Sequence, residues 1–166
     1  MRTSTSWAAL AIAAVVMGCP GPDSTTDPVS AWDAALIGAN EVPAVNSPGV
    51  ASGTFSLNAT GDTLVYALQI ATGVGTAVTQ SHIHTGNAGA TGGIAVWFCG
   101  TASNPGPAGT PTCAIAGTSA GTLITGRVAL PAATLTSMRN YGTYANIHTT
   151  GNTGGEIRGQ LRNIAP

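Results

Sequence analysis

The sequence predicts an all-β fold, an antiparallel Greek-key β-sandwich or barrel. Runs rich in β-branched and small residues are broken by glycine or proline roughly every 8 to 15 residues, which is typical of many short strands. A strand-turn-strand pattern that contains histidine occurs twice, and residues 131–138 are the single candidate for a helical turn. Long helices are therefore not expected.

The first 18 residues have the pattern of an export signal. One positive charge at Arg2 precedes an apolar run over residues 7–16, which is too short to span a membrane as a helix. Gly18-Cys19 resembles the end of the lipobox of bacterial lipoproteins, and this resemblance implies that Cys19 is lipidated and becomes the mature N-terminus. An ordinary secretory signal with an incidental cysteine is the alternative. Both interpretations predict an exported protein.

Residues 19–30 are the predicted tether between the anchor and the domain, because residues 20–28 contain three prolines and no apolar side chain. The rest of the chain, residues 31–166, is long enough for one domain with a hydrophobic core and too short for two. The lipid at Cys19 would attach this domain to a membrane of the bacterial cell envelope, on the extracytoplasmic side, at the outer membrane or the cell surface.

Eight strands are expected in this domain. Proline cannot donate to a β-ladder, so Pro43 and Pro48 place a turn after the first strand. Residues 60–62 join the next two strands as a hairpin, and the second of these is apolar at every other position from Leu64 to Ile70, which indicates one buried face. The expected strands are residues 32–38, 51–59, 63–71, 79–85, 93–99, 122–130, 144–149 and 156–162.

The repeated pattern lies at residues 81–89 and 145–154. In each copy an Ile-His-Thr sequence ends an apolar run, and a turn rich in glycine and asparagine leads into a second run. All three histidines of the chain, His82, His84 and His148, lie in these two copies. Any chemistry of the domain is therefore expected at this pair of turns.

The composition excludes some partners. Lysine is absent and charged residues make up 7% of the chain, so the sequence has neither a basic surface for nucleic acid nor an acidic tail. Nucleic acid is not expected as a partner.

Cys99 and Cys113 flank a loop rich in proline, glycine, serine and threonine that is not expected to hold its own shape. Export places the chain in an oxidising compartment, so a disulfide between these two cysteines is predicted. A redox or metal role is the weaker interpretation, because the two residues lack the close C-x-x-C spacing.

Four motifs, in this order along the chain, resemble the CHRD domain, which is named after the animal protein chordin and is frequent in bacterial secreted proteins. They are ALIGANEVP at residues 35–43, SHIHTGNAG at 81–89, YANIHT at 144–149 and GGEIRGQL at 154–161. The resemblance covers nearly the whole domain and implies an extracellular β-rich module, for which an activity is largely unassigned in bacterial members. The inserted loop between Cys99 and Cys113 departs from the usual pattern.

The histidines can form a metal site only under one geometric condition. His82 and His84 are two residues apart on a strand and so point to the same face, about 6.5 Å from each other. If Ile83 and Ile147 face the core, His148 lies on the same outer face, and the three imidazoles converge when the two copies lie side by side. Three neutral imidazoles suit copper or zinc. All three histidines are therefore candidate metal ligands.

A structural role is the alternative for these histidines, in which each Ile-His-Thr sequence bonds to the backbone of its adjoining loop and fixes a turn. The second copy has Asn146 where the first has His82, which favours this alternative. Glu156 and Arg158 also share a face of the last strand, where an ion pair is expected; the alternative is that Glu156 is a hydrogen-bond partner of one of the imidazoles.

His-x-His before a glycine turn is also similar to the copper-ligand strand of Cu/Zn superoxide dismutases, which are Greek-key sandwiches. The bridging histidine, the fourth copper histidine and the zinc-site aspartate have no counterpart, since Asp62 is the only acid between Glu41 and Glu156. The likeness therefore extends to an immunoglobulin-like or superoxide dismutase-like sandwich with a mononuclear site, and not to a dismutase.

The sequence shows no Ser/His/Asp or Cys/His nucleophile set and no paired carboxylates. We therefore expect a lipid-anchored, extracytoplasmic binding or structural module without catalysis of its own, with an extracellular protein as a candidate partner. The alternative is a copper or zinc protein that uses His82, His84 and His148, with redox activity left open.

Overall fold

The computed structural model describes residues 29–113, 120–121 and 123–164 of the chain. The predicted signal peptide, the predicted lipidation site Cys19 and the tether up to residue 28 lie outside the described residues. In the described part of the chain, no helix is long and apolar enough to cross a membrane.

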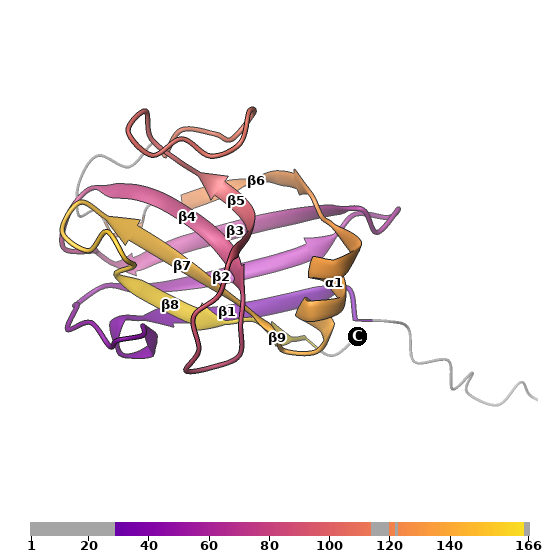
Figure 1. Cartoon of the computed structure of the whole chain (residues 1–166), viewed down its shortest axis with the longest axis horizontal. Coiled ribbons are helices and arrows are strands. Elements are labelled where there is room, and N and C mark those ends of the chain that lie inside the picture. The colour runs from indigo at the N-terminus through magenta and orange to yellow at the C-terminus, as the bar shows by residue number, and fades with distance from the viewer. Residues whose placement is uncertain (1–28, 114–119, 122, 165–166) are drawn as a thin grey trace, which may run out of the picture.

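Nine antiparallel strands form one sheet that curls into a nearly closed barrel (Figure 1). The strands are β1 (Ala31–Ile37), β2 (Val50–Leu57), β3 (Thr63–Thr72), β4 (Val78–Thr85), β5 (Ile94–Cys99), β6 (Leu123–Ala129), β7 (Thr143–Thr149), β8 (Ile157–Gln160) and β9 (Arg162–Asn163). Their order in the sheet is β5-β4-β7-β8-β1-β2-β3-β6, with β9 paired to β1. The all-β prediction is confirmed.

The interior of the barrel is apolar because alternate residues of each strand point inward. On β3 the predicted face is confirmed, since the four alternating side chains are at most 2% exposed: Leu64, Tyr66, Leu68 and Ile70. Aromatic rings join strands that are distant in sequence, with Phe98 of β5 lying 5.8 Å from Phe55 of β2 and 4.2 Å from the Tyr66 ring, measured between ring centroids. The core therefore links the two halves of the barrel.

The two copies of the repeated pattern form the hairpins β4–β5 and β7–β8, and these hairpins lie side by side in the sheet. β4 pairs with β7 in antiparallel register from Val78 opposite Thr149 to Thr85 opposite Thr143. The turns of the two hairpins therefore lie at opposite ends of the β4–β7 pair, while the histidine-bearing strands run next to each other (Figure 1).

The end of the chain differs from the prediction of one strand over residues 156–162. Leu161 is fully buried and donates its N–H to Thr143 of β7, whereas Arg162 and Asn163 pair with β1. This change of partner divides the predicted strand into β8 and β9. The predicted helical turn is present as α1 (Ala132–Arg139), preceded by Pro131.

Two other segments shape the surface. A short 3-10 helix, η1 (Gly38–Asn40), follows β1 where the prolines predicted a turn. The Cys99–Cys113 disulfide is present and closes the loop that follows β5.

Candidate metal centre

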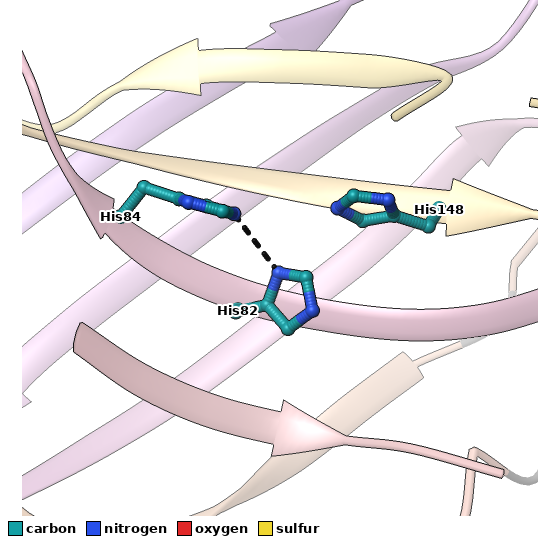
Figure 2. Close-up of side chains that lie close together, drawn as sticks. All are labelled: His82, His84 and His148. Atoms are coloured by element: carbon teal, nitrogen blue, oxygen red, sulfur yellow. Dashed lines mark hydrogen bonds between the residues drawn. The ribbon is translucent and has the colours of Figure 1, made fainter. Parts of the chain in front are cut away.

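Three imidazole rings converge on the outer side of the sheet, over β4 and β7 (Figure 2). Potential ligand atoms of His82, His84 and His148 all lie within 4.8 Å of one another. Nδ1 of His82 is 3.1 Å from Nε2 of His84, and a ring nitrogen of His148 points toward the same space (Figure 2). The structure therefore meets the geometric condition on which the metal hypothesis depends.

The convergence follows from the strand register. Side chains that are paired across two antiparallel strands project to the same face. The register of β4 and β7 places three such pairs on the histidine face: His82 with Asn146, His84 with Tyr144, and Gln80 with His148. Ile83 and Ile147 are fully buried on the opposite, core side. The alternation inferred from the sequence thus holds in both strands.

His84 and His148 each use Nδ1 to bond the loop that follows their own strand. Nδ1 of His84 lies 2.9 Å from the carbonyl oxygen of Gly92, and Nδ1 of His148 lies 2.8 Å from that of Thr153. A carbonyl oxygen only accepts, so each Nδ1 carries a proton and each Nε2 keeps a lone pair. The structural role considered for these histidines is therefore real. The same bonds turn both Nε2 atoms toward the cluster. In metal sites, a hydrogen bond at the other ring nitrogen orients a ligating histidine in the same way.

His82 has two possible proton arrangements. Its Nδ1 is 3.1 Å from both Nε2 of His84 and Oδ1 of Asn146, and its Nε2 is 2.8 Å from Oε1 of Gln80. In one tautomer, Nδ1–H donates into the cluster and Gln80 turns its amide to donate to Nε2. In the other, Nε2–H donates to Gln80 and the lone pair of Nδ1 faces that of His84. A cation between the rings favours the second tautomer, because coordination replaces the repulsion of lone pairs.

Burial keeps the three rings neutral. His82 is 0% exposed, His84 8% and His148 7%. Burial, together with the neighbouring His148 and His84, lowers the pKa of His82 from 6.5 to about 3. Burial also lowers the pKa of His84 and of His148. Near neutral pH all three rings are in the deprotonated form that binds metal ions.

One ring nitrogen of the cluster has no partner. Nε2 of His148 is buried and makes no hydrogen bond. A buried polar atom without a partner costs about 1–3 kcal/mol, and native structures contain few of them. A metal ion at the centre of the cluster would give this nitrogen a partner.

Aromatic side chains enclose the cluster. Trp97 of β5 packs edge-on against His82, with 4.5 Å between the ring centroids. Tyr144 lies parallel to His84 at 4.8 Å, and the guanidinium carbon of Arg158 is 3.3 Å from the Tyr144 ring centroid. These rings restrict the access of water to the histidines.

Arg158 also holds the β4–β5 loop over this face. Its Nη2 donates to the carbonyl oxygens of Asn87 and Ala90, at 3.1 and 2.7 Å. The amide N–H of Gly92 in the same loop donates to the Tyr144 hydroxyl at 3.3 Å. The outer face expected from strand alternation is therefore covered by the β4–β5 loop, which Arg158 and Tyr144 of the same face hold in place.

Glu41 is a buried acid that reaches the cluster through Asn146. It is 8% exposed, and its Oε1 has no hydrogen-bond partner. Burial raises the pKa of Glu41 to about 7, although the charge of Arg158 and hydrogen bonds from the Val42 backbone and the Asn146 side chain act in the opposite direction. Glu41 is thus partly protonated near neutral pH.

The prediction of an ion pair between Glu156 and Arg158 is wrong. The Glu156 carboxylate instead accepts hydrogen bonds from the Ser47 hydroxyl, the Gly75 amide and the Thr149 hydroxyl, each at 2.6 Å. Glu156 precedes β8 and so lies outside the strand alternation on which the expectation rested. Burial opposes ionisation, but these three bonds hold the pKa of Glu156 below its ordinary value.

The sequence located all three histidines but not the residues that surround them. Gln80, Trp97 and Tyr144 contact the rings because of the register of β5, β4 and β7. Their spacing in the sequence carries no signal of its own. The pairing of β4 with β7, once known, places Gln80 and Tyr144 directly.

Comparison with curated proteins and with solved structures finds no match. A family model described as the CHRD domain matches residues 32–161. This range contains β1 from its second residue, β2 to β8, the three histidines and the Cys99–Cys113 disulfide. The chain therefore belongs to the CHRD domain family.

Proposed function

We propose that this CHRD domain is an exported, lipid-anchored module that binds one copper or zinc ion through His82, His84 and His148. Membership of the CHRD family supports a binding or structural module. The convergence of three neutral, buried imidazoles is the observation that carries the metal assignment.

The spacing of the ring nitrogens supports this assignment. Two imidazole nitrogens bound to one ion at about 2.0–2.1 Å lie about 3.4 Å apart in tetrahedral geometry. Nδ1 of His82 and Nε2 of His84 are 3.1 Å apart, and the widest separation among the three ligand atoms is within 4.8 Å. The three rings would have to move closer together for all three atoms to reach bonding distance of one ion.

The atoms available for binding are Nδ1 of His82 and Nε2 of His84 and His148. With an ion bound, Gln80 would accept from Nε2–H of His82, while backbone carbonyls accept from Nδ1–H of the other two rings. Each ring would thus have a fixed tautomer and orientation when it binds the ion. Imidazole nitrogen suits copper and zinc better than magnesium or calcium, which prefer oxygen ligands.

A metal-free structural module is the second candidate. The bonds from His84 to Gly92 and from His148 to Thr153 favour it, because they fix both hairpin turns without any ion. In that case the module would act through an extracellular protein partner.

Metal stoichiometry separates the two candidates. Purified protein refolded with copper or zinc and then dialysed should retain about one ion per chain by elemental analysis, whereas a His84→Ala/His148→Ala variant should retain none. Asp33→Asn is a matched control, because Asp33 pairs with Arg162 at the exposed surface. A parent protein that keeps no stoichiometric metal would remove the metal assignment and leave the structural module.

The location is also part of the proposal. Gly18-Cys19 supports a lipid anchor, and the Cys99–Cys113 disulfide supports an oxidising, extracytoplasmic compartment.

A further inference from the structure

The three-histidine cluster offers no negative charge to a bound ion. Within the described residues, the potential metal donors grouped here are three imidazoles, without a carboxylate or thiolate. Oδ1 of Asn146, 3.1 Å from Nδ1 of His82, is a further donor close to the cluster, and it is neutral as well. An ion bound here therefore keeps its full formal charge, which is one for Cu(I) and two for Cu(II) or Zn(II).

Burial makes that charge costly. His82 is fully buried, and the unpartnered Nε2 of His148 is shielded from water. Trp97 and Tyr144 add low-dielectric surface on two sides of the cluster. The Born cost of moving an ion out of water rises with the square of its charge, so a divalent ion is penalised about four times as strongly as a monovalent one.

A fixed positive charge also lies close to the cluster. The Arg158 guanidinium rests on the Tyr144 ring, which in turn lies parallel to His84. Arg158 is 2% exposed, so solvent ions screen its charge only weakly. Its repulsion of a divalent ion is about twice its repulsion of a monovalent ion. Glu41 offsets this charge only in part, because burial raises the pKa of its carboxyl to about 7.

The number of donors also favours a monovalent ion. Cu(I) has a filled d shell and is stable with three neutral donors. Zinc in structural sites takes four ligands, and Cu(II) prefers a tetragonal arrangement. The cluster supplies three imidazole nitrogens, and Oδ1 of Asn146, 3.1 Å from Nδ1 of His82, is a neutral oxygen donor beside them.

We propose that the cluster selects Cu(I) over Cu(II) and Zn(II). This inference rests on the proposed metal-binding function and names the ion that the site takes. The usual order of affinities, in which Cu(II) exceeds Zn(II) at nitrogen sites, concerns divalent ions only, so the position of Cu(I) must be measured directly.

Competition titrations measure the selectivity. The parent protein is titrated anaerobically with Cu(I) against bicinchoninate, and in separate experiments with Cu(II) and Zn(II) against chelators of known affinity. The expected Kd for Cu(I) is lower than the other two by about 100-fold or more. A Kd for Zn(II) or Cu(II) equal to or below that for Cu(I) would overturn the selectivity while leaving the metal site intact. The absence of binding by all three ions would overturn both the selectivity and the proposed function.

A charge variant tests the part assigned to Arg158. Arg158→Gln should lower the ratio of the Zn(II) Kd to the Cu(I) Kd on the order of tenfold, because the repulsion between one positive charge and the ion is removed. Arg162→Gln, which removes an exposed charge paired with Asp33, should leave the ratio unchanged. An unchanged ratio in a folded Arg158→Gln protein would overturn the role of this charge. Should that variant not fold, the three dissociation constants of the parent protein decide the proposal.

Discussion

At the scale of single residues, the histidines of this domain have two roles at once. Nδ1 of His84 and of His148 fixes a hairpin turn, while Nε2 of the same ring faces the cluster. The structural and metal-binding hypotheses therefore do not exclude each other. The turns hold the rings in place before any ion arrives, which lowers the entropy cost of binding.

The low pKa values of the three histidines make the metal-free protein sensitive to acid. The unfolded chain takes up protons at these residues below about pH 6.5, whereas the folded protein resists protonation until the pH approaches about 3 at His82. Stability from the histidines is therefore complete above pH 6.5 and is lost as the pH falls toward 3. We expect the melting temperature, followed by circular dichroism, to fall steadily between pH 6 and pH 4. Stability that rises over this range would contradict the prediction.

Glu41 changes the stability of the protein with pH in the direction opposite to the histidines. Its pKa is raised from 4.5 to about 7, so its contribution to stability is present below pH 4.5 and is lost as the pH rises through 7. Glu41→Gln should stabilise the protein relative to the parent more at pH 8 than at pH 5, by no more than about 3 kcal/mol. Urea denaturation at both pH values measures the difference. As a control, Asp33→Asn should change the free energy of unfolding by the same small amount at each pH. An equal effect of Glu41→Gln at both pH values would contradict the raised pKa of Glu41.

At the scale of the elements, the repeated hairpins explain how the cluster forms. Strand alternation in the sequence places His82 and His84 on one face, and the structure agrees. The sequence could not give the pairing of β4 with β7, because that pairing depends on the closure of the whole sheet. Loop contacts were equally hidden: Glu156 bonds to Ser47 and Gly75, which are distant in sequence, and to Thr149 at the end of β7.

The disulfide loop has its own testable contribution. Cys99 and Cys113 are 14 residues apart, and closing a loop of this size contributes about 3 kcal/mol in the chain-entropy model. Cys99→Ser/Cys113→Ser should lower the free energy of unfolding by about 2–3 kcal/mol in urea denaturation. Adding a reductant should have a similar effect on the parent and none on the variant. A parent whose stability is unchanged by complete reduction of the disulfide would contradict this expectation.

At the scale of the whole molecule, composition and periodicity were sufficient for the fold class. The runs of small and β-branched residues between glycine and proline predicted strands that the structure contains. Most strand ends differ from the predicted ends by one or two residues. These runs do not distinguish a nearly closed barrel from two separate sheets, because the difference depends on the pairing of β8 with β1. The inward and outward faces followed from alternation alone.

The predicted anchor concerns the whole chain in its cell. Expressed in a bacterium, the full chain should sediment with the membranes and carry a lipid on Cys19. A Cys19→Ala variant should lose the lipid, which mass spectrometry detects, and should leave the lipoprotein pathway. A parent protein that is released without lipid would instead indicate an ordinary secretory signal.

The central claim is that one ion is held by three imidazoles drawn from two neighbouring hairpins. X-ray absorption spectroscopy of the copper-loaded protein tests it most directly, because imidazole rings give a distinctive multiple-scattering pattern. We predict three imidazole nitrogens per copper at about 2.0 Å, and the loss of this pattern in the His84→Ala/His148→Ala variant. Copper bound by fewer than three imidazoles, or a spectrum that the variant leaves unchanged, would contradict the claim.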